Sequence, residues 1–172
     1  ELRHMAELCM KHHVVMFSDE IHSDLIFHGK KHTPVATLSP EIAKYVITGI
    51  SGTKTFNLAG LQASTVVFPD KRTKWVFDNF WRSMDIHRNN AFSLTAMETA
   101  FREGEEWLDQ LLPYLSDNFD FVVDYCAKHI PQIKTYAPDA TYLMWLDCRG
   151  LGMADEELRT FMIEKAGLGL NE

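Results

Sequence analysis

The chain has 172 residues, of which 46% are hydrophobic and 24% charged, the balance of a globular protein with a core. Its net charge is −7, and it has neither a basic run nor a basic stripe interleaved with aromatic residues, so we expect no nucleic-acid partner. We also expect no membrane partner, because no apolar stretch approaches the roughly 18–20 residues of a membrane span. Three widely separated cysteines fit neither a zinc set nor a disulfide framework and indicate a reducing, cytoplasmic setting.

Helix and strand patterns alternate through the first 70 residues. Residues 2–11 have one apolar side at helical spacing, and Ser39 followed by Pro40 is typical of a helix start. Three short apolar runs suit strands buried on both faces: residues 14–17, 45–50 and 64–68. This succession predicts an α/β fold, with a mostly parallel sheet covered by helices.

The middle of the chain is helical. The spacing of apolar residues predicts helices over residues 71–85, from a capping Ser93 to Arg102, and over residues 105–129. Pro113 falls inside the last of these, where it should kink the helix or mark a new start.

The pattern changes after Pro131. Residues 132–136 and 141–147 read as strands around a turn, and residues 155–166 as a helix that Gly167 ends. We therefore expect residues 1–130 to be part of a large domain and residues 131–172 to begin a smaller α+β domain. Because both ends lie in or directly after a helix, we interpret the chain as a piece of a longer protein.

Two polar segments follow buried-strand candidates. One is residues 18–22, Ser-Asp-Glu-Ile-His, and the other begins with Ser51-Gly52-Thr53-Lys54. In open α/β sheets ligands bind beyond the carboxyl ends of strands, so both segments lie where a site is expected.

The second segment has the composition of an anion site next to an amine. Ser51, Thr53 and backbone N–H groups near Gly52 suit a phosphate, because a glycine turn lets the backbone approach closely. Lys54 would then act as a charge partner or as an amine nucleophile. The spacing of a Walker loop is absent, which favours a phosphorylated cofactor attached through Lys54 over a nucleotide.

The first segment complements such a cofactor. The Asp19 carboxylate would keep a pyridine nitrogen protonated, and His22 would reach the ring oxygen. Taken singly, each of these residues also fits an ordinary turn, loop or exposed surface.

Together, Asp19-x-x-His22 and Ser51-x-Thr53-Lys54-Thr55-Phe56-Asn57 resemble the fold-type I pyridoxal-phosphate (PLP) enzymes of the class I and II aminotransferase superfamily. Within them, the chain is most similar to the MalY/PatB-type branch of cystathionine β-lyases, or C–S lyases. The likeness extends over essentially the whole chain and includes residues 58–62 and 142–147.

The resemblance implies roles for five residues. Lys54 forms a Schiff base with PLP and later moves the substrate Cα proton. Asp19 pairs with the pyridinium nitrogen, His22 stands where most relatives carry a tyrosine, and Ser51 and Thr53 hold the phosphate. It also implies a homodimer in which residues 85–90 approach the neighbouring subunit.

One position departs from the aminotransferase pattern. Gln62 stands eight residues after the lysine, where aminotransferases of this fold usually have a phosphate-binding arginine. Together with His22, this favours β-elimination on an L-cysteine S-conjugate such as cystathionine. A plain packing role for Gln62 stays open.

Two other functions stay open as well: an aminotransferase that acts on an L-amino acid through the same lysine, and a regulatory protein that retains PLP. A metal site is not expected, because Gly29 and Pro34 break any helix that would align His28 with His32. Because the family's N-terminal region and a later substrate-binding arginine are missing, we expect the 172 residues alone to be inactive.

Overall fold

The chain forms two compact units in the computed structural model, which describes residues 1–86 and 89–171. Unit 1 comprises Glu1–Tyr114 and Asp139–Tyr142, and unit 2 comprises Leu115–Pro138 and Leu143–Glu172. His87 and Arg88, in the segment expected to approach a second subunit, lie outside the described residues. The predicted domains, residues 1–130 and 131–172, refer to a longer protein and stay a prediction.

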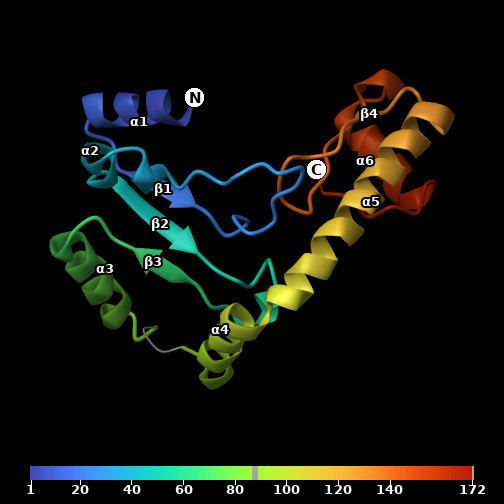
Figure 1. Cartoon of the computed structure of the whole chain (residues 1–172). Helices are drawn as coiled ribbons and strands as arrows, with labels where there is room; N and C mark the ends of the chain where they lie inside the picture. The colour runs from blue at the N-terminus through green and yellow to red at the C-terminus, as the bar shows by residue number, and fades with distance from the viewer. Residues whose placement is uncertain (87–88, 172) are drawn as a thin grey trace. The chain divides into compact units, whose positions relative to one another are not determined.

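Unit 1 is built around a three-stranded sheet in the order β1-β2-β3 (Figure 1). β1 (Met16–Asp19) runs parallel to β2 (Val46–Ile50), with Asp19 opposite Gly49. β3 (Thr65–Val67) pairs antiparallel with the other side of β2. The predicted α/β class is confirmed, although within the described residues this sheet has one parallel and one antiparallel pairing.

The first strand begins two residues later than the apolar run predicts. The amide of His13 donates to Met10, and the amide of Val14 donates to Cys9 at 2.8 Å. With His13 in the left-handed region at φ 55°, this is a Schellman motif that ends α1 (Leu2–Lys11). Residues 12–15 thus close the helix, and the ladder starts only at Met16.

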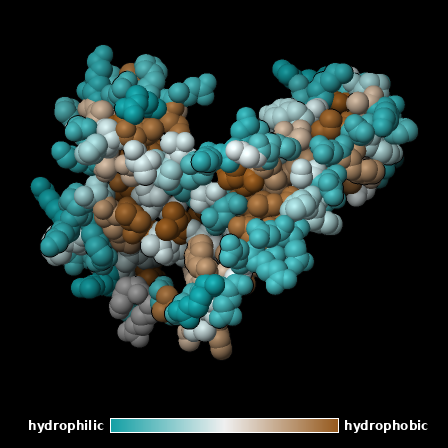
Figure 2. All heavy atoms as spheres, viewed as in Figure 1, coloured by the Kyte–Doolittle hydropathy of each residue, from teal (hydrophilic) through white to brown (hydrophobic). Residues whose placement is uncertain are grey.

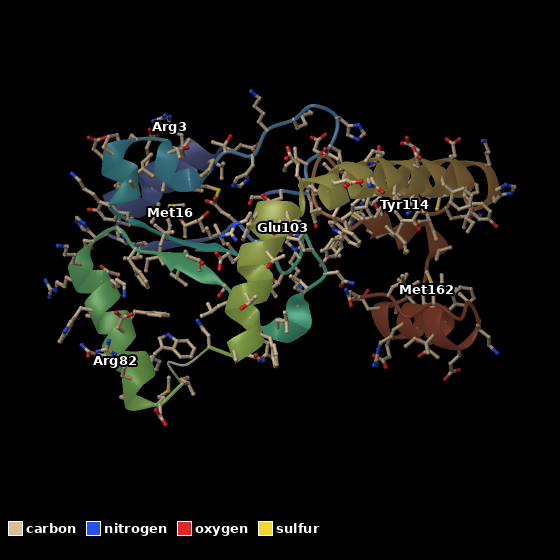
Figure 3. All side chains as sticks on the ribbon, turned by 60° about the horizontal axis from the view of Figure 1, so that its bottom comes forward. Arg3, Met16, Arg82, Glu103, Tyr114 and Met162 are labelled. Atoms are coloured by element: carbon tan, nitrogen blue, oxygen red, sulfur yellow. The ribbon has the colours of Figure 1, made fainter. Side chains whose placement is uncertain are left out.

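A small apolar core lies between the sheet and the helices that precede β2. The Ser39 side chain caps α2 (Pro40–Ala43) by accepting from the Ile42 amide, as the sequence predicts. Met16, labelled in Figure 3, packs against this core below α1 and α2. The buried members of the core come from α1, the 3₁₀ turn η1 (Val35–Thr37), α2 and β2: Ala6, Val35, Ile42 and Val46.

The prediction that Ser93 caps a helix is wrong. Asn90 caps α4 (Ala91–Glu103) by accepting from the Phe92 amide. Ser93 lies inside the helix and is 1% exposed, with its hydroxyl donating to the Leu61 carbonyl at 2.6 Å. Leu61 ends the turn η2 (Ala59–Leu61), so this bond fastens α4 to the segment after Lys54. The preceding helix, α3, spans Lys71–Ser83.

The long helix α5 (Glu105–His129) passes through Pro113 without ending. In unit 2, its last turns pack with the short strands β4 (Lys134–Thr135) and β5 (Leu146–Asp147), which pair antiparallel. The turn η3 (Arg149–Leu151) and α6 (Asp155–Glu164) follow. The buried residues of this unit's core are Cys126, Ile133 and Met162.

Candidate active site

The two polar segments meet at one edge of the sheet. Asp19 is the last residue of β1, and Lys54 lies four residues after Ile50, which ends β2. Because β1 and β2 are parallel neighbours, their carboxyl ends lie at the same edge. The ladder continues one step further, with the Glu20 amide donating to the Gly49 carbonyl at 2.8 Å. Asp19 and Lys54 are 35 residues apart in the sequence, and the pairing of β1 with β2 brings their segments together.

The lysine segment is a tight, buried turn. Gly52 accepts at its carbonyl from the Phe56 amide at 2.9 Å, and Thr53 accepts from the Leu58 amide at 2.8 Å. A Cβ at position 52 would lie 3.0 Å from the Phe56 ring and 3.2 Å from the Phe101 ring, so a larger residue there would have to displace these rings slightly. Lys54 is half-buried.

The hydroxyls of Ser51 and Thr53 lie 2.8 Å apart, and both residues are buried. The Ser51 hydroxyl also accepts from the Thr53 amide at 3.0 Å and lies 2.6 Å from the Ala63 carbonyl. The single Ser51 proton is therefore used inside the loop, and donation to a phosphate requires it to turn away from these acceptors.

His22 is influenced by two charged residues of the predicted site. Burial lowers the pKa of its imidazole, the Lys54 charge lowers this pKa further, and the Asp19 carboxylate acts in the opposite direction. Both predicted cofactor groups are thus close enough to act electrostatically on His22. The Asp19 carboxylate accepts locally from the Ile21 amide at 3.3 Å. The structure thus brings Lys54, Asp19 and His22 near one another, as the sequence predicts for a common site.

Two further hydrogen bonds hold the lysine turn at Thr55, and sequence reasoning missed both. The Thr55 hydroxyl donates to the Asp24 carboxylate at 2.9 Å, joining the lysine turn to the turn after β1. The Trp107 indole donates to the Thr55 carbonyl at 3.3 Å. Thr55 is 1% exposed, and its place directly after the lysine was the available signal.

Glu20 is a buried carboxylate that the sequence pattern did not single out. It is 7% exposed and accepts from Ser18, from the Val35 amide at 3.2 Å and from His32 Nε2 at 2.9 Å. Burial acts to raise the pKa of Glu20, but these hydrogen bonds outweigh it and the pKa is lowered. His32, which the sequence suggested to be an ordinary loop residue, is the ion-pair partner of Glu20.

Gln62 is exposed and adopts the left-handed conformation with φ 52°. It lines a cavity of about 950 Å³ together with residues of η2, β3 and α3, among them Leu61, Val66 and Phe77. Gln62 ends η2 as its left-handed C-cap, which fits the plain structural role that the sequence also allows.

The donor set fits PLP. An amine and a carboxylate follow adjacent strand ends, and buried residues with two hydroxyls and a closely packed glycine precede the amine. An aldehyde, a pyridine nitrogen and a phosphate require these three kinds of partner.

Within residues 1–86 and 89–171, no group of three or more His, Cys, Asp or Glu side chains is placed to hold a metal ion. In the same part of the chain, no helix combines the length and the apolar character needed to cross a membrane.

Comparisons with known proteins agree with this arrangement. The family model of class I and II aminotransferases matches residues 1–170. Cystathionine beta-lyase PatB of Bacillus subtilis (strain 168) is 41% identical over 165 residues, which are 96% of this chain and 43% of PatB.

Solved structures give the same result. A PLP-bound protein from Clostridium difficile 630 matches 99% of this chain and 44% of its own, with a TM-score of 0.95 and 44% identity. Cystalysin from Treponema denticola, whose crystal structure contains PLP, matches 100% of this chain and 44% of its own, with a TM-score of 0.91 and 30% identity. The chain thus spans less than half the length of each of these proteins.

Proposed function

The chain belongs to the class I and II aminotransferase family, and we propose on that premise that the whole protein is a PLP-dependent carbon–sulfur β-lyase. Its substrate would be an L-cysteine S-conjugate such as cystathionine, cleaved to a thiol, pyruvate and ammonia. The observation that carries the dependence on PLP is the position of Lys54 and Asp19 at the carboxyl ends of paired parallel strands. The family resemblance predicted from the sequence is confirmed by the family match.

When bound, PLP supplies an aldehyde that takes up an amino group and a protonated ring that accepts electrons from the substrate Cα. The Lys54 amine would hold the aldehyde carbon and, once displaced by the substrate amine, would remove the Cα proton. The Asp19 carboxylate would hold the proton at the ring nitrogen. The strand-end position of Lys54 supports this role, because it places the amine where ligands bind in open α/β sheets.

The other residues would bind and orient the cofactor. Ser51 and Thr53 would hold the phosphate with hydroxyls that the turn already brings within 2.8 Å of each other. His22 would donate to the ring oxygen. The short hydrogen bonds within the turn support this assignment, because a rigid turn limits the entropy lost on binding.

The lyase proposal rests on relatives and on two residues. PatB is named a cystathionine beta-lyase, and Gln62 and His22 replace groups typical of aminotransferases. An aminotransferase is the second candidate, and it also fits the matched family. It would use Lys54 and Asp19 in the same way, but would return a proton to the cofactor instead of expelling a thiolate.

The two candidates differ in their need for a keto acid. With the whole protein and cystathionine, we expect pyruvate and thiol to form without any keto-acid acceptor, at the same rate as when a keto acid is added. Pyruvate is measured with a coupled dehydrogenase and the thiol with a colorimetric reagent. Turnover that depends strictly on an added keto acid would support the aminotransferase instead.

We also propose a homodimer that acts on a small amino-acid substrate. The exposed side chains of α3 support an interface at this helix, because Trp75 is 66% exposed and Phe80 is 59% exposed. Apolar side chains of this size normally contact protein, either the rest of the chain or a second copy. Figure 2 shows hydrophobic surface over the region of the strands and α3.

A further inference from the structure

A short segment far along the chain is fastened to the turn that carries His22. The Phe27 amide donates to the Asp139 carbonyl at 2.9 Å, and the Thr141 amide donates to the Leu25 carbonyl at 2.8 Å. Ile26 and Ala140 form an isolated antiparallel bridge between these two bonds. Residues 139–142 therefore belong to unit 1, although the neighbouring residues on both sides belong to unit 2.

Thr141 has an unfavourable backbone. Its φ is 67°, in the left-handed region, where the Cβ atom is crowded by the backbone. The conformational free-energy cost of this region is largest for β-branched residues such as threonine. The other described non-glycine residues with positive φ are unbranched at Cβ: His13, His28, Asn57, Gln62 and Asp85. Strain of this kind persists where surrounding contacts impose it, and it concentrates at functional sites.

The strained backbone brings the Thr141 side chain to His22. Its Oγ1 lies 3.0 Å from His22 Nδ1, across 119 residues of sequence. The Tyr142 ring stands edge-on to the same imidazole, with ring centroids 5.2 Å apart and planes at 64°. The imidazole is thus held by a hydrogen bond to one nitrogen and by an aromatic contact, which leaves Nε2 as its other polar atom.

We propose that Thr141 is a positioning residue whose hydroxyl donates to His22 Nδ1 and so keeps the imidazole proton on Nε2. The inference rests on the proposed function, in which Nε2–H donates to the cofactor's ring oxygen. A neutral imidazole has one N–H, and a nitrogen that accepts from Thr141 cannot carry it. Tyr142 holds the ring plane, and Lys54 and Asp19 supply the charges that face it.

The tautomer can be observed without cofactor, which separates this inference from the proposed function. The whole protein is labelled with ¹⁵N-histidine, and His22→Gln assigns the His22 signals. We expect the wild-type imidazole to carry its proton on Nε2 at pH 7.5, and Thr141→Ser to retain this state. Thr141→Val keeps the shape and the branched Cβ but removes the hydroxyl, and it should produce a mixture of tautomers.

Thr37→Val is the matched control, because the Thr37 hydroxyl also makes one hydrogen bond, to the Pro34 carbonyl, away from the site. It should leave the His22 signals unchanged. A wild-type proton on Nδ1, or an unchanged tautomer in Thr141→Val, would overturn the proposal. Failure of the protein to take up PLP would count against the proposed function alone.

The cofactor-loaded protein gives a second measurement. A hydrogen-bond donor to the cofactor's ring oxygen stabilises the negative charge of that oxygen. It thereby lowers the proton affinity of the Lys54 nitrogen that is joined to the cofactor. In a pH titration of the cofactor's visible absorbance, Thr141→Val should therefore raise the midpoint by about 0.5–1 unit, the effect of one neutral hydrogen bond. Thr141→Ser and Thr37→Val should keep the wild-type midpoint. In Thr141→Val, a changed tautomer with an unmoved midpoint would count against the proposed role of His22 at the ring oxygen, whereas an unchanged tautomer with an unmoved midpoint would overturn the positioning role of Thr141.

Discussion

Lys54 combines two properties that a cofactor-binding amine needs. It is half-buried inside a turn that two backbone hydrogen bonds close, and it acts electrostatically on His22. An exposed lysine such as Lys44 shares the charge but neither the burial nor the strand-end position. These differences make Lys54 the residue whose replacement tests the site most directly.

Replacing Lys54 with Ala should remove both covalent attachment and turnover. Borohydride reduction of the wild-type protein loaded with PLP should fix the cofactor on the peptide containing Lys54, as mass spectrometry of a digest would detect. Lys54→Ala should give no such adduct, and its β-elimination rate should fall at least about 1,000-fold, because the proton-transferring amine is gone. Lys44→Ala should behave as wild type, and an adduct on another lysine would refute the assignment.

The turn that follows β1 is organised by Glu20. Its carboxylate collects hydrogen bonds from β1, from η1 and from His32 in the intervening loop. These contacts fix the chain on both sides of Asp19 and His22. Glu20 therefore stabilises the element that presents two of the proposed site residues.

Glu20→Gln should lower the thermal midpoint of the whole protein at pH 7, because hydrogen bonds to a charged acceptor become bonds to a neutral one, a loss of about 1–3 kcal/mol. The lowered pKa means that this stabilisation is present above the ordinary value of 4.5 and is lost as the pH falls through the folded-state value. The difference between variant and wild type should therefore be largest near pH 7 and shrink below about pH 4. Thermal scans over this pH range measure it.

The exposed Glu7 provides the control, since Glu7→Gln should change the midpoint little at any pH. A Glu20→Gln midpoint equal to that of wild type at pH 7 would show that the carboxylate does not organise the turn.

Local sequence patterns predicted what depends on local structure. The runs before Asp19 and Lys54 predicted strands, and the pairing of β1 with β2 confirms that the two motifs lie at one edge of the sheet. The start of β1 differed because His13 takes a left-handed conformation that ends α1, which apolar spacing does not encode. Ser93 was misassigned because a serine near a helix start resembles a cap, whereas its partner, Leu61, lies 32 residues away.

Contacts between distant residues account for what the sequence did not predict. The bond from Thr141 to His22 and the ion pair of His32 with Glu20 depend on how loops fold onto the sheet. Nothing in the spacing of these residues specifies that placement. The charge and hydroxyl of each residue type were visible, but their partners were not.

At the scale of the whole molecule, the chain leaves much apolar surface uncovered. Phe17 on β1 is 62% exposed and Val67 on β3 is 52% exposed, in addition to Trp75 and Phe80 on α3. Patches of this kind are usual at interfaces and cause association when left open. The chain spans 43% of PatB, so a longer protein would have residues available to cover them.

The 172-residue chain produced alone should therefore self-associate and show no β-elimination. Light scattering coupled to size exclusion should give a mass that rises with concentration, because burial of apolar surface drives the association. Replacing Trp75 with Lys and Phe80 with Glu should reduce this dependence. Trp145 in unit 2 is 70% exposed and provides the control. If the chains associate through α3 and the sheet, Trp145→Lys should leave the dependence of the mass on concentration unchanged. A monomer at all concentrations, or measurable release of pyruvate from cystathionine, would contradict the expectation that this chain needs further protein to complete its surface and its site.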